Sequence, residues 1–227
     1  MKGFKKRLND EILTKLSARR VVIYLLGLFI LALGVSFSVK SRLGVSPVNS
    51  IPYTVSMLTG IEQGLCTSVI FTLLIFLQLL ISPRTFSPFA FLQIICSFVF
   101  GWFVTLSNLA ISFIPEPEEY WLRLVFTAVG VLLVAVGVFL YVGADLLMLP
   151  GEGVMTAMSQ RTKLSFPACK MIFDCSMVAG AVILSLAFTG TLLGVREGTV
   201  ISAIGVGLVM KPIAGFFTVR LQKLLDK

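Results

Sequence analysis

The sequence contains no histidine and few charged residues, and both features narrow what the chain can be. None of the 227 residues is histidine and 13% are charged, whereas about a quarter are charged in a typical soluble domain. Without histidine, a Ser–His or Cys–His nucleophilic pair is excluded within this chain. The four cysteines lie in apolar segments without a C-x-x-C motif, which gives a disulfide framework or a zinc site little support. We therefore expect no enzyme, no cofactor and no metal site.

Long apolar runs are what the sequence does contain. Hydrophobic residues make up 57% of the chain, and the mean hydropathy is +0.98. A helix needs about 20 apolar residues to cross the ~30 Å hydrocarbon core of a bilayer. The runs are continuous and do not alternate with polar residues, which predicts an all-α polytopic membrane bundle rather than a β-barrel. The six predicted spans are Val21–Val39, Gly64–Ser82, Pro88–Ile114, Trp121–Gly143, Phe166–Thr189 and Gly198–Val219.

The net charge of +8 is concentrated at the two ends of the chain. Residues 1–20 hold seven Lys or Arg and the segment from residue 211 onward holds four, whereas the central loop "IPEPEEY" holds three acids and no base. By the positive-inside rule, both termini are predicted to be cytoplasmic and the acidic loop to lie on the other side. The basic residues then contact anionic lipid, so the expected partner is the bilayer and not nucleic acid.

Residues 1–20 also show a helical period. Phe4, Leu8, Ile12 and Leu16 recur every four residues, with Lys and Arg between them. This pattern predicts an amphipathic helix that lies on the cytoplasmic leaflet. A segment that binds a partner protein is the alternative.

The sequence aligns with itself at an offset of 103 residues. "GLFILALGVSFSVKSRLGVSP" from Gly27 matches "GVLLVAVGVFLYVGADLLMLP" from Gly130, and 11 of 45 positions from residue 22 to residue 66 are identical. With a three-residue insertion, Gly101 also matches Gly207. We interpret the chain as a duplication. The predicted divisions are a surface helix (1–20), a first membrane repeat (21–114), an acidic loop (115–120), a second membrane repeat (121–219) and a cytoplasmic tail (220–227).

Each repeat is predicted to hold three spanning helices and one short helix that begins at proline. Pro47–Gly60 and Pro150–Lys163 are too short to cross a membrane at about 1.5 Å per residue, and proline favours the first helical position. We interpret them as half-helices that dip into the membrane; short tilted spans are the alternative. Three crossings per repeat invert the second repeat and place the acidic loop opposite the basic termini. Inverted repeats with paired broken helices are typical of transporters.

The half-helices predict a binding site between the repeats. Their N-terminal ends would meet near the middle of the membrane, each with unpaired N–H groups and about half a unit of positive charge. Asn49 and Glu152 are equivalent at the 103-residue offset. Each side chain could simply cap its helix, but an acid paired with an amide favours an asymmetric site for one substrate or ion. The predicted substrate-binding residues are Ser46, Pro47, Asn49, Ser50, Pro150, Gly151, Glu152, Gly153 and Thr156.

Further polar residues lie inside predicted spans. Asp174 follows Lys170 by four residues, so the two can pair on one helical face, either as a structural ion pair or in proton or cation coupling together with Glu152. Gln78 and Gln93 are isolated and predict hydrogen bonds between helices.

The segments "LGVSP" and "LLMLPGEG", and the late "REGTVISAIGVGLVMKPI", resemble the YczE/YyaS/YitT family of bacterial integral membrane proteins. The resemblance covers nearly all of residues 21–215 and implies a multi-pass protein of the bacterial plasma membrane. Members of that family tend to carry an aromatic residue and then an acid after the proline. Here the positions are Val48–Asn49 and Gly151–Glu152, so only the second repeat keeps the acid.

The sequence favours a transporter or permease for a small solute, with a site between the repeats. A membrane scaffold or accessory subunit, which acts through its basic ends, is the second hypothesis. An intramembrane enzyme is the third, and it would require Glu152 and Asp174 to lie within a few ångströms of each other. A homo-oligomer is compatible with each of these hypotheses.

Overall fold

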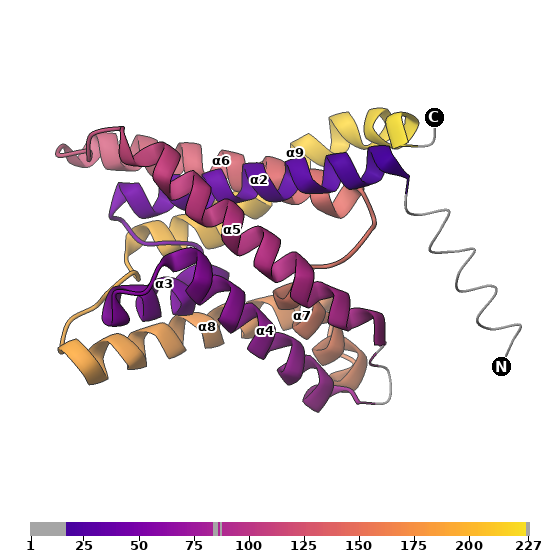
Figure 1. Cartoon of the computed structure of the whole chain (residues 1–227), viewed down its shortest axis with the longest axis horizontal. Coiled ribbons are helices and arrows are strands. Elements are labelled where there is room, and N and C mark those ends of the chain that lie inside the picture. The colour runs from indigo at the N-terminus through magenta and orange to yellow at the C-terminus, as the bar shows by residue number, and fades with distance from the viewer. Residues whose placement is uncertain (1–16, 84–85, 87, 226–227) are drawn as a thin grey trace, which may run out of the picture.

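The computed structural model describes residues 17–83, 86 and 88–225, and all regular structure in these residues is helical. The predicted surface helix falls almost entirely on residues 1–16, which lie outside the described part of the chain. Figure 1 shows the arrangement of the elements. They are α2 (Ala18–Ser41), α3 (Pro47–Thr59), α4 (Gln63–Ile81), the 3-10 helix η1 (Pro88–Phe91), α5 (Leu92–Ser112), α6 (Tyr120–Gly143), α7 (Pro150–Thr162), α8 (Phe166–Thr189) and α9 (Glu197–Leu225).

Six of the described helices are long and apolar enough to cross a membrane: α2, α4, α5, α6, α8 and α9. The predicted polytopic helical bundle is therefore confirmed. The remaining α-helices, α3 and α7, have 13 residues each and a length of about 20 Å, which is too short for a full crossing. The main difference in boundaries is at the end, where α9 continues to Leu225, so residues 220–225 extend the last span instead of forming a separate tail.

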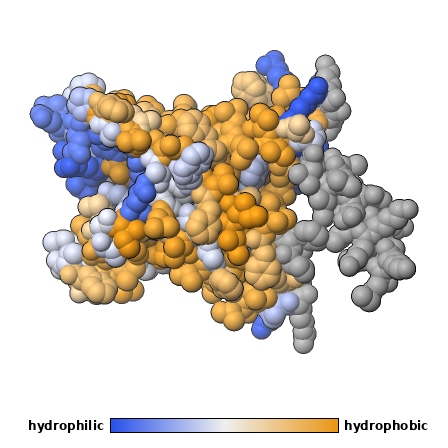
Figure 2. All heavy atoms as spheres, in the orientation of Figure 1, coloured by the Kyte–Doolittle hydropathy of each residue, from blue (hydrophilic) through white to orange (hydrophobic). Residues whose placement is uncertain are grey.

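The path of the chain matches an even number of crossings. In Figure 1 the start of α2 and the end of α9 lie at one end of the molecule, whereas the loop between α5 and α6 lies at the opposite end. Figure 2 shows a broad hydrophobic belt between these ends, with hydrophilic residues gathered mainly around the α5–α6 loop and near the chain ends. The chain is a multi-pass membrane protein.

Glycines let α2 and α6 pack backbone to backbone. A Cβ atom on Gly27 would lie 3.0 Å from the carbonyl oxygen of Gly137, and one on Gly34 would lie 2.8 Å from that of Gly130. Small residues at such positions allow the close approach on which helix association in membranes depends. The earlier glycine of α2 meets the later glycine of α6 and vice versa, so the two helices run antiparallel.

The local structure repeats at the same offset as the sequence. At the end of α3, the Ser56 hydroxyl donates to the Ile61 carbonyl at 2.7 Å. At the end of α7, Ser159 donates to Leu164, also at 2.7 Å. The C-cap residue of each half-helix is left-handed, with φ of 69° in α3 and 60° in α7. Together with the antiparallel α2 and α6, these are features that an inverted repeat requires, and we keep the inverted repeat as our interpretation.

The two halves differ in how their last two helices pack. In the first half α4 and α5 are in close contact, because a Cβ on Gly64 would lie 2.2 Å from the Gly101 carbonyl oxygen. In the second half, α9 packs mainly on α6, and α8 and α9 make at most weak contact. At Gly207, the repeat partner of Gly101, a Cβ atom would meet no other atom within 4 Å.

This difference predicts that the same substitution lowers stability in the first half and not in the second. In Gly101→Ala the new methyl group would lie 2.1 Å from the Ser68 hydroxyl oxygen, so we expect a loss of about 1–3 kcal/mol of stability. Gly207→Ala has free space, and alanine is the better helix former, so no loss is expected. Thermal unfolding of both variants in detergent checks this, and equal melting temperatures would contradict the described packing.

The fold also predicts that the α5–α6 loop and the C-terminal end of α7 are accessible to a labelling reagent from opposite sides of the membrane. In a background with all four cysteines replaced by serine, Glu118→Cys should react with a membrane-impermeant maleimide in intact cells. Lys163→Cys, at the end of α7, should react only after permeabilisation. Reaction of both positions from the same side would show that the α5–α6 loop and the C-terminal end of α7 do not face opposite solutions.

Candidate functional site

The starts of α3 and α7 meet inside the bundle. A Cβ atom on Gly151 would lie 3.4 Å from Cγ1 of Val48, and these two residues are themselves equivalent at the 103-residue offset. Each helix has proline as its first residue, Pro47 or Pro150. Figure 1 shows that the segments before α3 and α7 run back into the bundle, so that the half-helices point outwards to opposite ends. The predicted head-to-head placement of the half-helices is thus present.

The backbone of the segment before α3 finds partners in the loop before α9 and in the first turn of α9. The Val45 N–H donates to the Gly194 carbonyl at 3.1 Å, and the Gly198 N–H donates to the Leu43 carbonyl at 2.7 Å. Non-helical backbone is tolerated at membrane depth only where protein or water surrounds it. These bonds hold the start of α3 in place.

The first turn of α3 is polar and buried. The Asn49 amide nitrogen donates to the Ser46 hydroxyl at 3.0 Å, and the Ser50 hydroxyl donates to the Ser46 carbonyl at 3.3 Å. Asn49 is 6% exposed, and its Oδ1 atom has no hydrogen-bond partner. Ser46, the N-cap residue, makes no side-chain capping bond. The amide therefore keeps an acceptor that the protein does not use.

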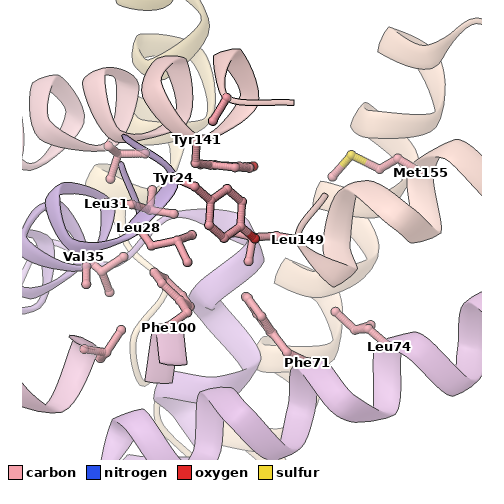
Figure 3. Close-up of a cluster of buried hydrophobic side chains, with 14 of the residues drawn as sticks. Tyr24, Leu28, Leu31, Val35, Phe71, Leu74, Phe100, Tyr141, Leu149 and Met155 are labelled. Carbon is pink, nitrogen blue, oxygen red and sulfur yellow. The ribbon is translucent and has the colours of Figure 1, made fainter. Parts of the chain in front are cut away.

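The first turn of α7 carries the carboxyl group of Glu152. The hydroxyl of Tyr141, on α6, donates to its Oε1 atom. The carboxyl group also interacts with the backbone of Leu149, the N-cap residue, which agrees in part with the capping alternative. The ring of Tyr24 packs edge-on against that of Tyr141, with centroids 6.1 Å apart, and its buried hydroxyl has no hydrogen-bond partner. Figure 3 shows Tyr24 directed towards Leu149, with Tyr141 on the other side of the Tyr24 ring.

The predicted pair on α8 forms and lies beside the same turn. Lys170 Nζ is 2.7 Å from Oδ2 of Asp174, while Oδ1 of Asp174 is buried without a partner. Phe173, next to Asp174, has its ring 3.5 Å from the position of a Cβ on Gly151. Lys170 is also close enough to Glu152 for their charges to interact. The two carboxylates and the lysine carry a formal net charge of −1 between them, which is costly within a membrane without a counter-ion.

Gln78 of α4 contacts α7 from the other side. Its Oε1 atom would be 2.3 Å from a Cβ on Gly153, so only glycine allows this approach. The atom is buried and has no hydrogen-bond partner. Gln93, on α5, likewise leaves its Oε1 unpaired. The sequence predicted hydrogen bonds between helices for both glutamines, but neither carboxamide oxygen makes one.

The structure brings together most, though not all, of the predicted residues. Residues of both first turns lie near the contact between Val48 and Gly151, whereas the Thr156 hydroxyl faces away to the sulfur of Met148, 3.8 Å distant. No hydrogen bond joins Glu152 to Asp174 in the described part of the chain. Among the residues described, no group of three Cys, Asp or Glu side chains could hold a metal ion. The absence of an enzyme activity stays a prediction.

Tyr24 and Tyr141 were missed by the sequence analysis. Tyr141 precedes Glu152 by 11 residues, which is too far for a pair within one helix, and the two meet only because the chain turns back between α6 and α7. One signal was available: these are the only tyrosines within the predicted spans. A buried tyrosine hydroxyl usually requires a partner, so each marks a position where one can be sought.

Comparison with known proteins identifies the family of this chain, but it assigns no activity. A family model described as "Family of unknown function (DUF6198)" matches residues 18–214. The "Uncharacterized membrane protein YczE" of Bacillus subtilis (strain 168) is 25% identical over 195 residues, which cover 85% of this chain and 84% of that protein. No solved structure matches the chain. The match to YczE confirms the predicted resemblance to a YczE-type family.

The contact between Tyr141 and Glu152 predicts a difference between the two tyrosines. Tyr141→Phe leaves a buried carboxyl oxygen without its donor, so a loss of about 1–3 kcal/mol is expected. Tyr24→Phe removes a hydroxyl that has no hydrogen-bond partner and should change stability little. Thermal unfolding of both variants, alone and with Glu152→Met, which removes the acceptor, measures the coupling; an additive double variant of Tyr141 and Glu152 would show that the contact contributes nothing.

Proposed function

The chain belongs to DUF6198, a family of unknown function, and from the geometry of its site we propose that it is a transporter or permease for a small solute. The site lies between the two halves of the chain, where α3 and α7 begin. The observation that carries this proposal is the contact between Val48 and Gly151, which joins the N-terminal ends of two oppositely directed half-helices. Discontinuous helices of this kind form the substrate sites of many transporters near the bilayer midplane.

The two first turns differ in chemistry, and the difference gives each a role. Ser46, Asn49 and Ser50 supply neutral polar groups on the α3 side, while Glu152 supplies a carboxyl group on the α7 side. Gly151 and Gly153 lack side chains and are covered by Val48, Phe173 and Gln78, so a solute would reach the start of α7 only after these side chains move. Pro47 and Pro150 fix the starts of the helices. Thr156 lies further along α7 and would act only if the helix moved.

Glu152, Asp174 and Lys170 are the proposed coupling groups. Lys170 pairs with Asp174, and its charge also acts on Glu152. Gain or loss of a proton or cation at either carboxylate would change which of them the lysine neutralises. Such a change couples ion binding to the position of α7 relative to α8.

The contact between the half-helices also separates the two sides of the membrane. Val48 and the ring of Phe173 both lie against Gly151, so that the first turns are sealed from each other by apolar groups. Transport requires this contact to open alternately towards each side, through movement of one half against the other. In the proposed orientation both termini face the cytoplasm of a bacterium, and the partners are lipid, the solute and, in a homo-oligomer, further copies of the chain.

Reconstitution into proteoliposomes tests the proposal. Substrate-induced charge movement or pyranine fluorescence would be recorded with glycine, n-butylammonium chloride and sodium butyrate, over a range of pH. Glu152→Gln cannot ionise, and we expect it to reduce flux at least tenfold and to abolish the dependence on pH. Glu118→Gln, in the α5–α6 loop, is the matched control and should behave as the wild type.

Wild-type flux by Glu152→Gln at every pH would remove Glu152 from the mechanism. If the wild-type protein binds solutes but moves none, it is not a transporter. The scaffold hypothesis would then be favoured if function in cells survived Asn49→Ala and Glu152→Ala but not deletion of residues 1–16.

A further inference from the structure

The loop between α8 and α9 lies across the segment that leads into α3. Residues 190–196 form this loop, which we call the strap, at the end of the molecule that also holds the α5–α6 loop (Figure 1). Leu43 and Val45 precede α3 and are each 0% exposed, although they follow the end of α2 directly and lie in no helix. The strap therefore covers the segment that leads to the first turn of α3.

Two hydrogen bonds attach the strap to α3 and to the segment before it. The Val45 N–H donates to the Gly194 carbonyl at 3.1 Å. The Thr54 hydroxyl, on α3 itself, donates to the Leu193 carbonyl at 3.2 Å. Both acceptors are backbone carbonyls of the strap, so the same two groups could be satisfied by water if the strap moved away.

A third attachment joins the strap to the α5–α6 loop through one arginine. The Arg196 guanidinium donates to the Arg42 carbonyl at 3.4 Å, and the Arg42 side chain pairs with the carboxylate of Glu116. The side chains of this chain of contacts are exposed, and exposed ion pairs contribute little to stability. The outer edge of the strap is therefore held weakly.

The helices on either side of the strap leave it free to move. In the part of the chain that the structure describes, α8 and α9 make at most weak contact, so displacement of the strap breaks no packing between them. The strap begins at Gly190, where φ is 67° and a Cβ atom would meet no other atom within 4 Å. Glycine adopts this conformation without strain and can leave it as easily, which suits a hinge.

The middle of the strap lies closely on α3. At Gly194, φ is 73°, and a Cβ atom would lie 2.6 Å from Cδ1 of the Tyr53 ring. Any other residue at this position would be strained and would also have to displace the ring. The closed position of the strap thus depends on a glycine, whereas a displaced strap would not.

We propose that the strap is a gate, which closes the start of α3 in this structure and on release exposes Ser46 and Asn49 to the solution at the end that holds the α5–α6 loop. The gate regulates access to the proposed binding site, so its purpose rests on the proposed transport function. Its movement does not, and can be measured without a solute. The rival interpretation is a static cover that leaves its place only when the whole protein unfolds.

A buried thiol under the strap reports its movement. Val45→Cys is placed in a background with Cys66, Cys96 and Cys175 replaced by serine, while Cys169, 0% exposed on α8, is kept to report global unfolding. The full-length protein in lipid nanodiscs is treated with a trimethylammonium methanethiosulfonate, whose fixed charge restricts it to water. Mass spectrometry follows both thiols. Local opening costs less than global unfolding, so the reporter thiol should react about tenfold faster than Cys169, or more.

Two substitutions loosen the strap, and a third is the matched control. Thr54→Val keeps the shape of the side chain and removes the bond to Leu193, so the reporter should react about fivefold faster. Gly194→Ala should act in the same direction. Thr59→Val also removes a hydroxyl from α3, but one that donates to the Val55 carbonyl of the same helix at 2.8 Å, and the reporter should keep its original rate.

Each outcome supports or overturns the gate. Equal rates at the reporter and Cys169, or equal reporter rates in Thr54→Val and Thr59→Val, would overturn it. The rate at Cys169 corrects for any general loss of stability in a variant. Should Val45→Cys fail to fold, Leu43→Cys, equally buried, replaces it.

The labelling and flux experiments can also fail separately. Faster labelling in Thr54→Val, in a protein that moves no solute, would support the gate and contradict transport. Flux by a protein whose reporter thiol reacts no faster than Cys169 would overturn the gate while transport stands.

Discussion

Backbone N–H groups at the starts of α3 and α7 have no partner within their own helices, and the rest of the structure is arranged around this fact. In hydrocarbon such groups would be prohibitively costly, so the starts of both helices are enclosed by protein. Backbone bonds with Gly194 and Gly198, in the α8–α9 loop and the first turn of α9, hold the approach to α3, and the Tyr141 hydroxyl donates to Glu152 at the start of α7. The same enclosure brings residues of α3, α4, α6 and α8 against the first turn of α7.

The glycine contacts between α2 and α6 make this enclosure possible. Because Gly27 and Gly34 allow the helix backbones to touch, the two halves approach closely enough for their half-helices to meet. Tyr141 follows directly from this packing, since its backbone lies against Gly27 while its hydroxyl reaches Glu152. Packing and site chemistry are thus linked through one side chain of α6.

The sequence was sufficient for the architecture because hydrophobic run length and proline position are local signals. The six spans and both 13-residue half-helices follow from them, as does the pairing of Lys170 with Asp174, four residues apart on one helix. The sequence was not sufficient to predict which side chains line the site. Gln78 contacts Gly153, and Tyr141 contacts Glu152, only because different helices pack together. No periodicity or motif in the sequence predicts either contact. Asp174 was identified, yet its unpaired oxygen becomes visible only when its surroundings are known.

The unequal packing of the last two helices in each half has a consequence for movement. Two halves of related sequence here adopt two arrangements: α4 lies tightly on α5, while α8 stands apart from α9, whose Gly207 faces free space. Because the two halves have related sequences, each half could adopt the helix packing that is seen in the other. Exchange of the two arrangements, with α8 closing on α9 as α4 leaves α5, would yield a second conformation related to the first by reversal across the membrane. If the two halves form an inverted repeat, each half thus shows the arrangement that the other would adopt in a state open to the opposite side.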